Sequence, residues 1–180
     1  VTDFYSHKYT DCHADFICCK MTLEHIHAPA DFLKTVRRSI GDRKTVVFFQ
    51  VPDAKRIFTQ RAFWDIYYEH CCYFDSGSLS RLFRKCGFEP LEIQNEYSGQ
   101  YLTIEAYPNV AAFNPDQAAQ GAEQLSTHVE GFAEDCRQKF RQWRDFLKSL
   151  NRTGRRVVLW GGGSKAVAFL STIGITREIV

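Results

Sequence analysis

Two short apolar runs with an amphipathic segment between them constrain the fold of this chain most strongly. The runs, ADFICCKM at 14–21 and KTVVFFQVPD at 44–53, have the length and the apolar, β-branched and aromatic content of buried strands. The segment between them has Pro29 in its expected first helical turn and Gly41 after its last. Its apolar residues recur at helical spacing, at Phe32, Leu33, Val36 and Ile40. Strand, helix and strand in this order predict a right-handed βαβ unit in a parallel sheet, and therefore an α/β fold.

The next segments predict a helix followed by an antiparallel hairpin. Asp75 or Ser76 can cap a helix that Gly87 closes. The apolar residues of this helix are Leu79, Leu82 and Phe83. Two strand-like runs then flank Ser98-Gly99, a short turn. We therefore expect the parallel strands of the first half to end in an antiparallel hairpin at the sheet edge.

A long apolar stripe follows residues 109–114, which resemble a linker. Asn114-Pro115-Asp116 begins a helix with a cap and a first-turn proline. The stripe recurs at spacings of four and three, at Leu125, Val129, Phe132, Cys136, Phe140, Trp143, Leu147 and Leu150. It predicts one long amphipathic helix that ends near Asn151 or Gly154. This helix either packs on a domain as a connection or forms a coiled-coil seam between two chains, which would make a homodimer.

The last segment, RRVVLWGGGSKAVAFL at 155–170, has the pattern of a new domain. A strand is expected to run into Gly161-Gly162-Gly163, with a helix from near Ser164. This is the order of the first βα unit of a second Rossmann-like domain. The predicted parts are, in order, an α/β domain over 1–113, a linking helix over 114–153 and the start of the second domain over 154–180.

Composition narrows the class of protein. Hydrophobic residues at 44% and charged residues at 24% describe a soluble globular chain, and a net charge of +2 does not suggest a nucleic-acid or acidic-membrane surface. The longest apolar runs are too short for a membrane span, and the first residues lack a signal-peptide pattern. The seven cysteines include two adjacent pairs and no CxxC, which favours reduced thiols in a cytoplasmic protein. We expect no metal site, because the nearest candidates match no common zinc spacing: His7, Cys12, His13 and Cys18.

The candidates for chemistry lie at a strand end and in FWDIYYEHCCYF at 63–74. Open α/β sheets bind ligands at the carboxyl ends of parallel strands, which points to His25. In the second segment, His70 can serve as a general base and Tyr67 as a donor to an oxyanion. The alternative is a core segment in which the aromatic side chains are buried and Glu69 and His70 lie at its rim. In that interpretation His25 is a solvated loop residue.

A glycine-rich turn lies between the last expected strand and helix. Gly161, Gly163 and Ala166 form a GxGxxA pattern, and the backbone amides of such a turn, up to Ser164, point at an anion such as a nucleotide phosphate. The alternative is a tight turn that needs small residues for strand–helix packing. The acidic residue of a dinucleotide site is expected about twenty residues later, beyond Val180. A nicotinamide-linked oxidoreductase is therefore one alternative function.

Four segments, in this order and at these distances, resemble the sugar C-methyltransferase family: ADFICCKMTLEHIHAPADFL, FWDIYYEHCCYFDSGSLSRLFRKCGFE, GQYLTIEA and LWGGGSKAVAFL. The resemblance covers nearly the whole chain, and its most specific part is the YYEH…YF…SL block. Members use S-adenosylmethionine and often act on nucleotide-linked deoxy-keto-sugars. The resemblance implies a Rossmann-like class I methyltransferase sheet, here its C-terminal half, joined by a helix to a second Rossmann-like domain.

The resemblance also implies roles for particular residues. The histidine that matches His70 would deprotonate the carbon beside the ketone, and the enolate would attack the methyl group of the sulfonium. Tyr67, Glu69 and His25 match other active-site positions that serve proton transfer and substrate orientation. The remaining wall of the cofactor site would be formed by Cys19, Lys20, Met21 and Thr22.

The sequence departs from the family at its start. The glycine-rich cofactor loop and the zinc-binding region of family members would both precede residue 14. We therefore expect this chain to be a piece of a larger methyltransferase that does not catalyse alone. A non-catalytic interaction module, based on the long helix, is the remaining alternative.

Overall fold

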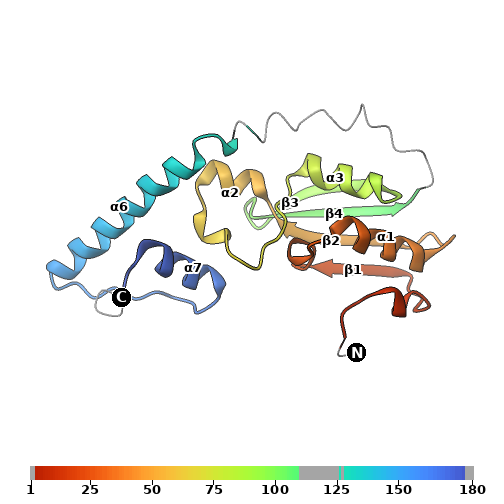
Figure 1. Cartoon of the computed structure of the whole chain (residues 1–180), viewed down its shortest axis with the longest axis horizontal. Coiled ribbons are helices and arrows are strands. Elements are labelled where there is room, and N and C mark those ends of the chain that lie inside the picture. The colour runs from red at the N-terminus through yellow and green to blue at the C-terminus, as the bar shows by residue number, and fades with distance from the viewer. Residues whose placement is uncertain (1–2, 110–125, 127, 177–180) are drawn as a thin grey trace. The chain divides into compact units, whose positions relative to one another are not determined.

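The computed structural model describes residues 3–109, 126 and 128–176 of the chain. The chain divides into two compact units, formed by residues 1–54 with 69–125 and by residues 55–68 with 126–180. In the described part of the chain there are one mixed four-stranded sheet and five α-helices, so the fold is α/β as predicted (Figure 1). No helix of this described part is long and apolar enough to span a membrane.

The first unit is built on the predicted βαβ element. β1 (Phe16–Lys20) and β2 (Val46–Pro52) pair in parallel, and α1 (Pro29–Ile40) connects them. Gly41 ends α1 with a φ of +61°, which a glycine adopts without strain. The predicted strand, helix and strand are therefore confirmed to within a few residues.

The hairpin at the sheet edge is also confirmed. β3 (Phe88–Glu96) pairs antiparallel with β4 (Tyr101–Pro108), and the strand order is β1-β2-β4-β3. The connecting turn has left-handed backbone at Ser98 and Gly99, where the sequence placed it. β4 pairs antiparallel with β2, so the hairpin extends the sheet beyond the parallel pair of β1 and β2, and β3 forms the edge.

Helices α1 and α3 (Ser76–Lys85) share one apolar core with the sheet. Inward side chains alternate along β2 and β4, and Phe49 meets Phe83 of α3 edge to face at 5.2 Å between ring centroids. Asp75 caps α3, because its Oδ1 accepts from the Ser78 amide at 2.7 Å while the Ser78 hydroxyl accepts from the Asp75 amide at 3.0 Å. The cap predicted from the sequence is thus in place.

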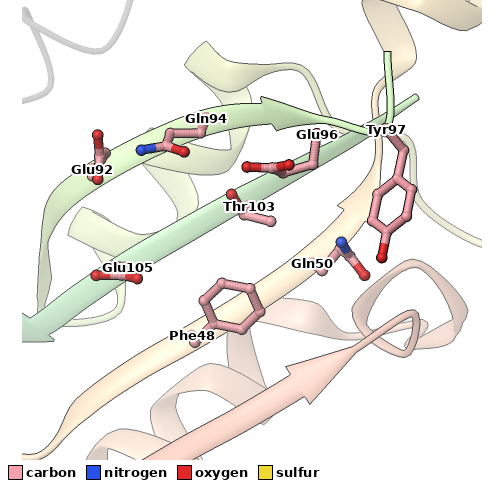
Figure 2. A pocket seen from close by; sticks show the side chains of 8 residues that line it. All are labelled: Phe48, Gln50, Glu92, Gln94, Glu96, Tyr97, Thr103 and Glu105. Atoms are coloured by element: carbon pink, nitrogen blue, oxygen red, sulfur yellow. The ribbon is translucent and has the colours of Figure 1, made fainter. Parts of the chain in front are cut away.

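The opposite face of the sheet is polar and acidic. It forms a shallow pocket of about 290 Å³ (Figure 2). Its lining residues come from β2, β3, β4 and the hairpin turn: Phe48, Gln50, Glu92, Gln94, Glu96, Tyr97, Thr103 and Glu105. The sequence predicted β2 to be buried on both faces, but Phe48 on this side is only half-buried.

The second unit has its own small aromatic core. It contains most of α2 (Ala54–Gln60), the 3₁₀ turn η3 (Phe63–Asp65), α6 (Phe132–Arg152) and α7 (Ser164–Ile173). Phe63 packs edge to face on Phe140 at 4.5 Å and stacks on Phe169 at 5.8 Å. The core interpretation of 63–74 holds for Phe74, which is buried in the first unit, but it is wrong for Tyr68, which is 98% exposed, and for His70, which is buried.

The prediction of one long continuous helix from Asn114 is wrong. Glu130 and Gly131 form a turn, and α6 begins only at Phe132. Gly131 has a φ of +75°, a left-handed conformation that interrupts a right-handed helix. The end of the helix near Asn151 is confirmed. The predicted linker beyond Asn109 and the predicted helix start lie outside the described residues.

The predicted strand at 155–160 is also not formed. These residues have no regular secondary structure, and Val158 and Trp160 are 79% and 99% exposed. A strand is stable only when its backbone groups pair with a neighbour, and the described part of this unit contains no strand to pair with it. The helix expected near Ser164 is present as α7.

Candidate active site

Two loops of the first unit meet at the carboxyl end of β1. The first is the 3₁₀ turn η2 (Leu23–His25), and the second is the EHCC segment at 69–72. The carbonyl oxygen of Glu24 accepts hydrogen bonds from the amides of Cys71 and Cys72 at 2.8 and 3.0 Å. Hydrogen bonds between main-chain groups therefore hold the strand-end loop against a segment some 45 residues later.

The two adjacent cysteines strengthen the same contact. The Cys71 thiol donates to the carbonyl oxygen of His25 at 3.6 Å, and the Cys72 thiol donates to that of Ile26 at 3.4 Å. Both cysteines are free thiols. Burial raises the pKa of the Cys72 thiol, so it remains a donor at neutral pH. Cys71 and Cys72 thus have a structural role, because their thiols hold the two loops together by hydrogen bonds.

His25 and His70 are brought together by these loops. Their ring centroids lie 4.9 Å apart at an interplanar angle of 68°. Nδ1 of His25 lies 2.8 Å from the carbonyl oxygen of Glu69. A carbonyl oxygen only accepts, so Nδ1 carries the hydrogen and, in the neutral ring, Nε2 carries the lone pair. His70 is buried and also contacts the ring of Tyr73, whereas His25 is partly exposed.

A buried carboxylate completes the cluster. Glu24 is 1% exposed, and its Oε1 lies 3.9 Å from Nε2 of His25. Neither carboxylate oxygen accepts a hydrogen bond from the described residues. Burial raises the pKa of Glu24 above its usual range, although its own backbone amide and the nearby His25 oppose the shift. The sequence analysis did not identify Glu24. The signal that could have identified it is the position of an acidic residue directly before a strand-end histidine.

The other predicted active-site residues are placed differently. The side chain of Glu69 is exposed, and its contact with His25 is made by its main chain. Tyr67 is half-buried and belongs to the residues of the second unit. The structure thus assembles His25 and His70, and the roles of Glu69 and Tyr67 stay predictions.

The predicted cofactor residues lie beside a cavity of about 610 Å³. Cys19, Lys20 and Thr22 line it, and Met21, with a φ of +50°, turns the chain between them. Burial, the main cause, raises the pKa of Cys19 to about 11, and a hydrogen bond with Thr22 partly opposes the shift. Much of the remaining wall is apolar or aromatic: Phe4, Tyr5, Ile17, Phe32, Val36 and Phe49. This apolar part of the wall suits an uncharged, flat ligand group.

The glycine-rich turn of the second unit is open. Among the described residues, a Cβ built on Gly161 or Gly163 would meet nothing within 4 Å, so close strand–helix packing is not what these glycines provide there. Lys165, just after the turn, forms an ion pair of 2.7 Å with the buried Asp65. Binding of an anion at Gly161, Gly163 and Ser164 stays a prediction.

Comparison with known families and proteins points to methyltransferases. Residues 3–93 match the family model described as a methyltransferase domain. The chain is 25% identical over 141 residues to the C-methyltransferase NovU of Streptomyces niveus. That alignment covers 73% of this chain and 33% of NovU, so the chain spans about a third of the length of this curated relative.

Proposed function

This chain belongs to the methyltransferase domain family, and from that premise we propose that its protein is an S-adenosylmethionine-dependent C-methyltransferase with His70 as the general base. The observation that carries the proposal is the meeting of His70 with His25 and Glu24 beside the end of β1. This is the edge at which α/β sheets bind their ligands. The similarity to NovU, itself a C-methyltransferase, supports the same reaction class.

The proposed role of His70 is to accept a proton from the carbon next to a ketone. The C–H electron pair becomes the enolate, whose carbon is the nucleophile for a new carbon–carbon bond. A general base of this kind contributes about 10²- to 10⁴-fold to the rate, and imidazole suits it because its usual pKa is near neutrality. His25 is proposed to orient the substrate and Tyr67 to donate to the enolate oxygen, while Glu69 positions His25 through its carbonyl group.

The cavity beside Cys19 is the proposed site for the cofactor. S-adenosylmethionine, when bound, would supply an electrophilic methyl group, whose bond to sulfur would break with its electron pair left on S-adenosylhomocysteine. Apolar and aromatic walls fit its uncharged adenine ring, and the protonated thiol of Cys19 adds no charge. Cys19, Lys20, Met21 and Thr22 would form the wall that holds it. A nucleotide-linked deoxy-keto-sugar is the proposed substrate, on the basis of the family resemblance.

A methyl-transfer assay tests the proposal. The protein to which this chain belongs is incubated with methyl-¹³C S-adenosylmethionine and a panel of nucleotide-linked keto-deoxy-sugars, and the product is analysed by carbon NMR. We expect a methyl group bonded to carbon, and a loss of about 10²-fold or more in His70→Gln. His27→Gln is the matched control, because His27 is an exposed histidine of the strand-end loop. Product methylated only on oxygen or nitrogen, or an unimpaired His70→Gln variant, would refute the proposal.

A further inference from the structure

We propose that Glu24, His25 and His70 form a binding site for a divalent transition-metal ion. Each residue offers one ligand atom, and among the described residues these three atoms lie within 4.8 Å of one another. One carboxylate oxygen and two imidazole nitrogens form the donor set preferred by ions such as Fe²⁺, Co²⁺ and Zn²⁺. Mg²⁺ and Ca²⁺ instead favour sites made only of oxygen ligands.

The orientation of His25 is that of a metal ligand. Its Nδ1–H donates to the carbonyl oxygen of Glu69, and this leaves the lone pair of Nε2 beside the carboxylate of Glu24. Histidines that bind metal ions in proteins almost always donate their other ring N–H to a carbonyl or carboxylate group in this way. The ring is thus held in the correct tautomer before any ion arrives.

Glu24 supplies a second and independent observation. It is 1% exposed, and neither of its carboxylate oxygens accepts a hydrogen bond within the described residues. Buried polar atoms in proteins normally have a partner. Here two electron-pair donors, Glu24 Oε1 and His25 Nε2, face each other at 3.9 Å. A cation between them would satisfy both groups, and a proton shared by them is the competing explanation.

The loops allow the three ligands to close on an ion. Nitrogen and oxygen ligands lie about 2.0–2.2 Å from such ions, so the ligand atoms must approach one another by on the order of 1 Å. The backbones are already joined by the hydrogen bonds from Cys71 and Cys72 to Glu24. The thiols of these cysteines donate to main-chain carbonyl oxygens, so sulfur ligands are not expected.

An ion at this site would regulate the proposed methyl transfer, and this consequence alone rests on the proposed function. A ring nitrogen that binds a metal has no lone pair left for a proton. His70 can therefore act as the base only in metal-free protein, and the ion and the substrate proton compete for it.

A titration of the full chain with Co²⁺ tests the site. We expect one ion per chain with the visible absorption of nitrogen and oxygen ligands and without the near-ultraviolet band of thiolate ligands. Glu24→Gln and His70→Gln should each weaken binding at least about tenfold. His25→Asn is a third variant, whose amide can still donate to Glu69. His27→Gln is the control, and circular dichroism verifies folding of each variant.

The site would be overturned by an absence of Co²⁺ binding, which leaves the shared proton as the explanation, or by binding that the three variants leave unchanged. A near-ultraviolet thiolate band that disappears when cysteines are substituted would also overturn the site, because the ion would then be bound by cysteine thiolates. Methyl transfer distinguishes the two proposals. If Co²⁺ binds but increases methyl transfer, the site stands and His70 is not the base.

Discussion

Nδ1 of His25 donates a hydrogen bond of 2.8 Å to the main-chain carbonyl oxygen of Glu69. The two residues are 44 positions apart in the chain. This contact joins the end of a parallel strand to the EHCC segment, and it explains how the histidines meet although neither lies in a strand or an α-helix. The orientation of His25 therefore depends on a loop-to-loop contact.

Variants of His25 separate the contribution of its hydrogen bond to stability from that of the other contacts of the ring. His25→Ala removes the donor to Glu69 and should lower the free energy of unfolding by about 1 kcal/mol. His25→Asn places an amide donor near the position of Nδ1 and should recover at least half of that loss. Urea unfolding measures both variants. Equal destabilisation by Ala and Asn would show that the hydrogen bond does not join the loops.

Cys19 should react slowly with thiol reagents at neutral pH. Its pKa of about 11 leaves roughly one thiolate in a thousand at pH 8, and only the thiolate is nucleophilic. The rate of labelling by N-ethylmaleimide should rise about tenfold per pH unit up to pH 10. Peptide mass spectrometry resolves Cys19 from the exposed Cys18. A rate that levels off by pH 9 would contradict the burial of this thiol.

Asp65 should stabilise the second unit. It is buried and forms ion pairs with Lys165 at 2.7 Å and Arg56 at 3.6 Å. Asp65→Asn would leave two cations without their counter-charge, so we expect a loss of about 1–3 kcal/mol in the free energy of unfolding. Denaturant unfolding followed by the tryptophan fluorescence of this unit measures the effect.

The matched control for Asp65 is Asp135, which pairs with Arg61 at 2.6 Å. Both of these side chains are more than 40% exposed. Because solvent screens such a pair, Asp135→Asn should cost less than about 1 kcal/mol. Similar losses in the two variants would show that burial does not set the strength of the Asp65 pairs.

The elements that the sequence predicts well are those with local signals. The βαβ unit has apolar runs, a first-turn proline and a terminal glycine, and α3 has an Asp75 cap. These signals act within a few residues of the element that they define. The fold of the first unit was therefore predictable before any tertiary contact was known.

The errors have tertiary or conformational causes. The run at 155–160 has strand composition, but a strand also requires a neighbouring strand, which composition does not reveal. The apolar stripe continued past Gly131 with helical spacing, whereas the left-handed backbone at this glycine interrupts the helix. Periodicity reports which residues can share a face, and it does not report every break in the backbone.

The candidate site was predictable only in part. Both histidines were identified, because one follows a strand and the other lies in a titratable segment. Glu24 was missed, since its burial depends on the contact between the two loops. Conversely, Glu69 was selected for its carboxylate, but it contacts His25 through its main chain.

Solvent exchange at the substrate carbon tests the central claim most directly. The protein is placed in D₂O with S-adenosylhomocysteine and the keto-sugar that the methyl-transfer assay identifies, and deuterium at the carbon beside the ketone is followed by NMR. We predict exchange with the native protein, and a rate at least about a hundredfold lower with His70→Gln. Exchange that is equally fast with His70→Gln and with the native protein would contradict the assignment of His70 as the base.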